Sequence, residues 1–335
     1  MQLDFLHNHS EFPQLIEIVS SETGIIPQLI EKDYWIMQVL FGLKEQGFIF
    51  ELKGGTSLSK GFKIIDRFSE DIDIHIKPPP FLNVETNPSK NKSSHKQSRK
   101  NYYEWLAQKI KIDGILAIER DTNFDNEQTY NSGGLRLFYP SSMSNVAGVK
   151  EGVLLEVGFD TITPNSPMEI SSWAFDKAFA TNGVNILNNR AIEIPCYHPG
   201  YTLVEKLQTI TTKFRKEQES GVERPNLMRQ YYDVYCLLGN ESVIKFIGTQ
   251  DYLDHKRIRF PVVDFSIPIS ENKAFKFSDP NQLERFSVRF RNTSALYYNG
   301  QPQFELMIER INQFLYQFHL YFSSKLRRIF LPRRF

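Results

Sequence analysis

The segment that most restricts the fold runs from residue 53 to residue 76 and reads KGGTSLSKGFKIIDRFSEDIDIHI. Its two glycines, Gly54 and Gly55, follow the short apolar run FIFEL, which is typical of a strand. Carboxylate or imidazole alternates with isoleucine at its end, which predicts a second strand over 72–76. Because residues two apart in a strand face the same side, we expect Asp71 and Asp73 to converge.

Two adjacent carboxylates repel each other unless a cation lies between them. Mg²⁺ prefers oxygen ligands and usually binds one or two carboxylates together with substrate phosphates. The glycine turn offers backbone N–H groups that phosphate oxygens can approach closely. Thr56 and Ser57 add hydroxyl donors at the start of the next predicted helix, over 57–66, where the dipole favours an anion. The segment therefore predicts a site for a nucleoside triphosphate with Mg²⁺ or Mn²⁺. The alternative is a tight turn followed by a solvated edge strand.

Composition excludes several classes of protein. The 335 residues carry a net charge of +1, so any polyanion site must come from a local patch rather than a global field. Two cysteines, Cys196 and Cys236, are too few for a disulfide framework and indicate a reducing cytoplasm. The N-terminal residues lack the pattern of a signal peptide, and no apolar run approaches the ~20 residues that span a bilayer.

The remaining pattern predicts a mixed N-terminal half and a helical C-terminal half. Apolar spacing predicts a helix over 25–46, and composition predicts a long loop over 77–101 followed by a helix over 102–112. Strands are expected over 115–121, 134–139 and 153–160, the last two as a possible hairpin. Further helices are expected over 201–218, 226–239 and 303–326. The fold class is α/β (α+β), a mixed sheet with flanking helices over 1–165 followed by a mostly helical domain over 166–335 that completes the active-site cleft.

Three motifs in this order resemble a known family. EKDYW (31–35), KGGTSLSK (53–60) and RFSEDIDI (67–74) are similar to the AbiEii/AbiGii toxins, nucleotidyltransferase-like proteins of abortive-infection and toxin–antitoxin systems. The resemblance covers about residues 20 to 240. It implies the nucleotidyltransferase fold of the DNA polymerase beta superfamily, a nucleoside triphosphate substrate, a possible cognate antitoxin, and a role in phage defence.

The resemblance also implies roles for single residues. Gly55 and Thr56 match the phosphate-binding turn, with Gly54, Ser57 and Lys60 in the same motif. Asp71 and Asp73 match the metal-binding pair. Glu156, in the apolar strand VLLEVGFD, matches the third carboxylate, and Asp160 on the same strand is its rival. Lys206, in TLVEKLQTI, matches a lysine near the nucleotide, and Asp233, in RQYYDVYCLL, matches the fourth motif. Taken alone, Lys206 could be a solvated helix lysine, and Arg229 and Asp233 could pair at i and i+4.

Three functions remain open at this level. The first is nucleotidyl transfer to RNA, possibly the 3′ end of a tRNA, as the family suggests. The second is a small-molecule transferase of the antibiotic-modifying type, and the third is a nucleotide-binding protein without catalysis. Two basic segments could contact RNA phosphates or could be solvated. The first contains Lys90, Lys92, His95, Lys96, Arg99 and Lys100, and the second contains Lys325, Arg327, Arg328, Arg333 and Arg334.

Overall fold

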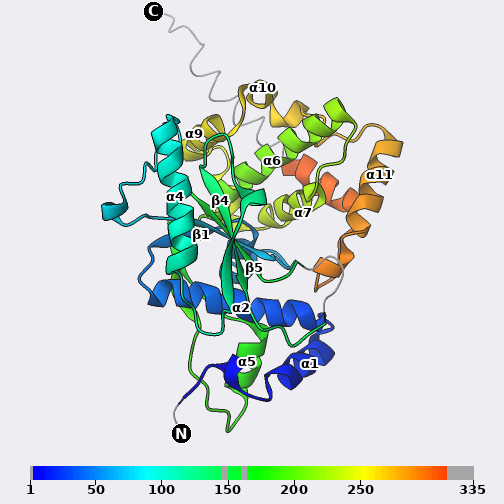
Figure 1. The fold of residues 1–335 in the computed structure, drawn as a ribbon. Helices are drawn as coiled ribbons and strands as arrows, with labels where there is room; N and C mark the ends of the chain where they lie inside the picture. Colours follow the sequence, from blue (N-terminus) through cyan, green and yellow to red (C-terminus); the bar gives the residue numbers. More distant parts are fainter. Residues whose placement is uncertain (1–2, 145–149, 160–163, 315–335) are drawn as a thin grey trace, which may run out of the picture. The chain divides into compact units, whose positions relative to one another are not determined.

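The computed structural model describes residues 3–144, 150–159 and 164–314. It divides into two compact units (Figure 1). Unit 1 contains residues 1–63 and 68–197, and unit 2 contains residues 64–67 and 198–335. The division after Tyr197 falls later than the boundary predicted at 165/166, because two strands and a helix that follow residue 165 pack with the sheet of unit 1.

Unit 1 is built on one mixed sheet of seven strands in the order β3-β4-β5-β2-β1-β7-β6. The strands are β1 (Phe50–Lys53), β2 (Asp71–Ile76), β3 (Ala117–Asp121), β4 (Ser132–Phe138), β5 (Val153–Gly158), β6 (Asn165–Ile170) and β7 (Ala191–Tyr197). β2 runs parallel to β5 and antiparallel to β1. β4 and β5 pair antiparallel, which confirms the expected hairpin. This mixed sheet with flanking helices confirms the predicted fold class.

The strands β6 and β7 lie in a part of the sequence that we expected to be helical. Each contains a proline, which weakens a strand signal, and the register pairs Pro167 with Pro195. β6 is the edge strand of the sheet, and sheet edges are where proline is tolerated. β7 lies inside the sheet between β1 and β6, so the edge position accounts for the proline of β6 and not for that of β7.

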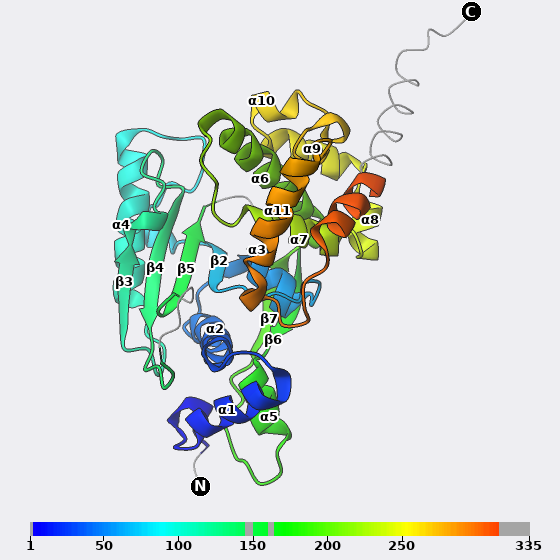
Figure 2. The same cartoon turned by 90° about the vertical axis from the view of Figure 1, so that its right-hand side faces the viewer.

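The helices of unit 1 are α1 (Phe12–Thr23), α2 (Pro27–Glu45), α4 (Ser93–Lys109) and α5 (Trp173–Ala180). α2 matches the expected helix over 25–46 and begins with Pro27, whose missing N–H is harmless in the first turn. α1 and α5 lie beside each other and both contact α2 (Figures 1 and 2). α4 packs on β3 and β4, and the ring of Tyr103 lies directly over Gly133.

The long loop that we expected over 77–101 is shorter than predicted, because α4 begins at Ser93. The serines and the asparagine of the stretch SSHKQSRKN favour a loop, yet its lysines, glutamine and arginine are good helix formers. Similarly, the helix expected over 57–66 is a short helical turn, α3 (Gly54–Thr56), followed by a π-helical turn (Ser57–Gly61). Residues 62–66 are not helical.

Unit 2 is helical, as expected. Its helices are α6 (Pro199–Ser220), α7 (Leu227–Leu237), α8 (Glu241–Phe246), α9 (Gln250–Arg259), α10 (Val262–Phe265) and α11 (Pro280–Arg291), and residues 304–314 are also helical. α6 and α7 pack side by side, and α8, α9 and α10 contact α6. The core is strongly aromatic, with Tyr231, Phe286 and Phe304 in mutual ring contact. No helix among the described residues is long and apolar enough to cross a bilayer.

Candidate active site

The predicted carboxylates lie in one row across the sheet of unit 1. Along β2, Asp71 and Asp73 are half-buried on one face, while Ile72, Ile74 and Ile76 are fully buried on the other. The parallel register places Glu156 of β5 directly beside Asp73, and the antiparallel register places Lys53 of β1 on its other side. Sheet register thus brings together carboxylates that are far apart in the sequence.

The electrostatics of this row reflect the crowding of negative charge. Burial, followed by the neighbouring carboxylates of Asp73 and Asp71, raises the pKa of Glu156 to about 8. Lys150 offers partial compensation, because its Nζ lies 3.5 Å from Oδ2 of Asp71. The other oxygen, Oδ1 of Asp71, is buried and has no hydrogen-bond partner among the described residues. A cation at this face would therefore relieve repulsion and satisfy an oxygen that the protein leaves open.

The donor set agrees with Mg²⁺ held by two carboxylates and by phosphate oxygens of a substrate. Asp71 and Asp73 present hard oxygen ligands on the same strand face, and Glu156 is the neighbouring third carboxylate. Within the described part of the chain, no group of three or more acidic, histidine or cysteine side chains forms a metal site by itself. Asp160, the rival third carboxylate, lies outside the described residues.

The glycine turn is in direct contact with the carboxylate row. Gly54 has a φ of +71°, and a Cβ built on it would lie 2.1 Å from Oδ2 of Asp73. Only glycine fits here, because any other side chain would displace this carboxylate and would also strain the backbone. The turn predicted to bind phosphate therefore lies against the strand predicted to bind metal.

The polar side chains of the turn are engaged within the protein. Thr56 and Ser57 are fully buried. Oγ1 of Thr56 donates to the carbonyl of Asp71 at 2.5 Å, and Oγ of Ser57 donates to the carbonyl of Gly54 at 3.0 Å. The ammonium of Lys60 pairs with Asp33. These side chains hold the turn in place, and backbone N–H groups remain the candidates for contact with phosphate.

Unit 2 contains the other two predicted site residues, Lys206 on α6 and Asp233 on α7. Asp233 is fully buried, and its Oδ2 lies 3.0 Å from Nζ of Lys206. Arg67 donates two hydrogen bonds to the same carboxylate, from Nε to Oδ1 at 2.6 Å and from Nη2 to Oδ2 at 2.7 Å. Burial alone would raise the pKa of Asp233, yet the cations of Arg67 and Lys206 hold it below its ordinary value.

Sequence reasoning missed Arg67 as a partner of Asp233. The arginine opens the RFSEDIDI motif, and its position there was the available signal, although no local pattern connects it to a residue on α7. Residues 64–67 belong to unit 2, whereas Phe68 and the following strand belong to unit 1. The structure thus gives Asp233 the role of a shared counter-ion for two cations.

The first basic segment is only partly a charged surface. Arg99 is fully buried. Its guanidinium donates to the backbone carbonyls of Glu85, Asn87, Lys90 and Thr129. It therefore organises the loop before α4 and cannot contact RNA, in contrast to the exposed lysines nearby. The second basic segment, from Lys325 to Arg334, lies outside the described residues.

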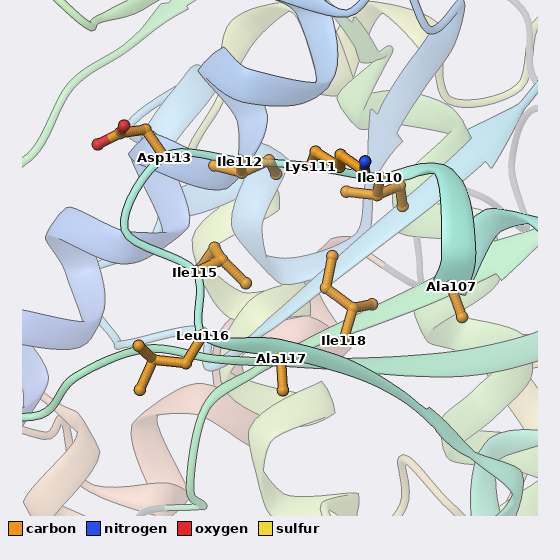
Figure 3. Close-up of a pocket in the computed structure, with 9 residues that line it drawn as sticks. All are labelled: Ala107, Ile110, Lys111, Ile112, Asp113, Ile115, Leu116, Ala117 and Ile118. Carbon is orange, nitrogen blue, oxygen red and sulfur yellow. The ribbon is translucent and has the colours of Figure 1, made fainter.

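A cavity of about 410 Å³ lies elsewhere in unit 1 (Figure 3). It is formed by the end of α4 and the connection to β3, and its lining includes Ile110, Ile115 and Ile118 together with the charged residues Lys111 and Asp113. Asp113 points away from the other labelled side chains in Figure 3 and pairs with His7 at 2.8 Å. None of the predicted site residues lines this cavity.

A glycine turn packed against a row of strand carboxylates on a mixed sheet defines the class of nucleotidyltransferases. The family comparison agrees with this class. The model of the nucleotidyl transferase AbiEii toxin family, part of a type IV toxin–antitoxin system, matches residues 38–310. The chain belongs to this family, and it is a nucleotidyltransferase of the toxin type.

No curated protein matches the chain. A solved structure that is similar is the crystal structure of an antigenic nucleotidyltransferase-like protein from Paracoccidioides brasiliensis. It is 13% identical in sequence with a TM-score of 0.34, and the match covers 81% of this chain and 95% of that chain.

Proposed function

We propose that this toxin transfers a nucleotidyl group from a nucleoside triphosphate to a hydroxyl group of RNA, such as the 3′ end of a tRNA, and that the reaction depends on Mg²⁺. The observation that carries the proposal is the row formed by Asp73 and Glu156, with Gly54 in contact with the carboxylate of Asp73. With Asp71 on the same face of β2, this row supports a site in which Asp71 and Asp73 would bind the metal and Glu156 would act as a base beside the phosphate-binding turn. Arrest of growth in the bacterial cytoplasm during phage attack is the physiological role that we propose with it.

Asp71 and Asp73 would hold Mg²⁺, with Mn²⁺ as an alternative ion, and Glu156 would complete the site or act as the base. When bound, the ion would neutralise charge on the triphosphate. Gly54 keeps the turn close to Asp73, so that the phosphates and the carboxylates share one small region. Much of the catalysis would then come from positioning the two reactants.

The bond changes in the proposed reaction balance without an additional reactant. The acceptor oxygen forms a bond to the α-phosphorus, the bond from this phosphorus to the bridging oxygen breaks, and pyrophosphate leaves with the electron pair. The acceptor proton would pass to the ionised carboxylate of Glu156, which lies beside Asp73 in the parallel register of β2 and β5.

Support for RNA as acceptor comes from a stripe of lysines on α4. Lys92, Lys96 and Lys100 are four residues apart, so they follow one face of the helix at intervals of about 6 Å. No carboxylate is paired with any of the three among the described residues, and the ammonium of Lys100 lies 5.9 Å from the ring centre of Tyr130. Uncompensated lysines beside an aromatic ring suit a phosphate backbone with unstacked bases.

The experiment that tests the proposal is incubation of the purified protein with each labelled nucleoside triphosphate, Mg²⁺ and total RNA. We expect label in RNA with the natural protein, and none after chelation of the metal or with Asp73→Asn. Label in small molecules only would replace RNA by a small-molecule acceptor. Bound nucleotide without transfer under all conditions would contradict the proposal and favour a binding protein without catalysis.

A further inference from the structure

The EKDYW motif buries three consecutive charges in the middle of α2. Glu31, Lys32 and Asp33 are each at most 1% exposed. Charged residues are almost never fully buried unless they are paired, so each should have a partner. Consecutive helix residues point in different directions, and these three accordingly contact different segments of unit 1.

Two of the three charges fix the chain between β4 and β5. The carboxylate of Glu31 accepts hydrogen bonds from Ser141 and Ser142 at distances between 2.6 and 2.8 Å. The ammonium of Lys32 donates to the carbonyl of Lys150 at 2.6 Å. These contacts support the start of β5, the strand that carries Glu156.

The third charge, Asp33, reaches the glycine turn. Nζ of Lys60 lies 2.7 Å from Oδ1 and 2.9 Å from Oδ2 of Asp33. The backbone N–H of Trp173, the first residue of α5, donates to Oδ2 at 3.0 Å, and Nζ of Lys60 lies 5.1 Å from the centre of a Trp173 ring. The carboxylate is therefore shared between the turn and α5.

The contact of Asp33 with Lys60 is one of the contacts that fix the turn. At its start, Thr56 donates to the carbonyl of Asp71. At its end, Lys60 is held by Asp33, and between these points the chain makes a π-helical turn (Ser57–Gly61), an irregular geometry that is frequent at functional sites. Gly54, which touches the carboxylate of Asp73, lies at the other end of the same short stretch.

We infer that Asp33 is a positioning residue of the active site: through Lys60 it fixes the glycine turn against Asp73. The inference rests on the proposed function, since it assigns the ion pair to the same site. Asp33 precedes the residues 38–310 that the family model matches. We assign its role from its contacts with Lys60 and Trp173.

Three variants test this role: Asp33→Asn, Lys60→Met, and the double variant that carries both. Lys60→Met leaves the buried carboxylate of Asp33 without its cation, and Asp33→Asn leaves the partly exposed ammonium of Lys60 without its anion, so either variant can lose stability for that reason alone. The double variant removes both charges together, so it keeps the experiment decisive if a single variant does not fold. The control is Lys177→Met, which removes an exposed ion pair with Glu22 elsewhere in unit 1.

The first measurement is hydrogen exchange of the amides of residues 54–61, which does not depend on activity. We expect faster exchange there in the double variant than in the natural protein, and unchanged exchange in the control. The second measurement is the turnover number per folded molecule, taken at a temperature well below the melting temperature of each variant. We expect kcat to fall at least tenfold in all three variants. Because both residues act through one contact, the loss of kcat in the double variant should not exceed the larger of the two single-variant losses.

A merely structural ion pair would lower the melting temperature while leaving kcat and KM per folded molecule unchanged, and that result overturns the inference. Unchanged exchange over 54–61 in the double variant also overturns it. If the natural protein transfers no nucleotide, the proposed function fails separately. The inference is then judged by the exchange data together with the dissociation constant of a non-hydrolysable triphosphate with Mg²⁺, which should rise about tenfold in the double variant and not in the control.

Discussion

Asp73 of β2 and Glu156 of β5 are direct neighbours in a parallel pair of strands, so two carboxylates face the same side of the sheet at adjacent positions. Their repulsion, added to the burial of Glu156, raises the pKa of Glu156 to about 8. In the metal-free protein, the repulsion between these two carboxylates lowers the stability of the folded state. The predictions below follow from this relationship and from the contacts around it.

The first prediction concerns pH. The pKa of Glu156 is raised on folding from about 4.5 to about 8, so the folded state holds a proton that the unfolded state releases. The associated stability is present below pH 4.5 and is lost as the pH rises to about 8. We therefore expect Glu156→Gln to raise the melting temperature of the metal-free protein by several degrees at pH 8 and hardly at all near pH 4.5, since one pKa unit corresponds to about 1.4 kcal/mol. Melting curves in a chelator between these pH values measure the difference. A constant gap across the range would contradict the assignment.

The second prediction concerns Gly54 and has a matched control in Gly24. Both have positive φ, +71° and +73°, so alanine strains both backbones by about 1 kcal/mol. A Cβ at Gly24 meets nothing within 4 Å, whereas one at Gly54 meets Asp73. We expect Gly54→Ala to melt below Gly24→Ala, because its Cβ also displaces the carboxylate of Asp73, and we expect a loss of transfer activity per folded molecule, on the order of 100-fold, only for Gly54→Ala. Equal activity in both variants would separate the turn from the site.

The third prediction concerns toxicity. Expression of the chain alone should slow the growth of a bacterial host, and Asp73→Asn should abolish the effect at a matched level of folded protein. Because the substitution removes one of two repelling charges, the metal-free variant should melt no lower than the natural protein. Growth curves and melting curves of the same two proteins test both statements. A variant that is inactive because it is unfolded would assign Asp73 a structural role instead.

The fourth prediction concerns the buried counter-ion of unit 2. Asp233→Ala leaves Arg67 and Lys206 without their shared carboxylate, and breaking such a buried pair costs about 3–5 kcal/mol. The exposed pair of Glu241 and Lys245 is the control, because Glu241→Ala should cost at most about 0.5 kcal/mol. Urea unfolding measures both free energies. A fully stable but inactive Asp233→Ala protein would favour a direct catalytic role over that of a counter-ion.

The fifth prediction separates the lysine stripe of α4 from the buried arginine beside it. Charge reversal of Lys92, Lys96 and Lys100 should weaken use of RNA and make it less sensitive to salt, with no change in the affinity for triphosphate. Arg99→Ala should instead lower the melting temperature, since it leaves three backbone carbonyls of the preceding loop and the carbonyl of Thr129 without their donor. Salt titrations of RNA binding, with a triphosphate binding assay in parallel, test the distinction. Equal losses of RNA and triphosphate binding would place the stripe at the nucleotide site.

Local sequence patterns were enough to predict those features of the site that lie close together in the chain. Alternation in DIDIHI placed Asp71 and Asp73 on one strand face because the period of a strand is two. Paired glycines marked the turn, and apolar spacing marked α2 and the helical half, since both signals depend only on neighbouring residues. The order of the motifs was sufficient to indicate the family.

Which distant residues meet depends on how the strands and helices pack together. Only the register of β2 with β5 places Glu156 beside Asp73, and only the packing of α2 brings Asp33 to Lys60. Arg67 and Asp233 meet although 166 positions separate them in the sequence. The local sequence around Arg99 resembles a solvated loop, but the folded structure buries this side chain completely. Such pairings depend on which elements pack together, and sequence periodicity reports which face of an element is buried but not what lies against it.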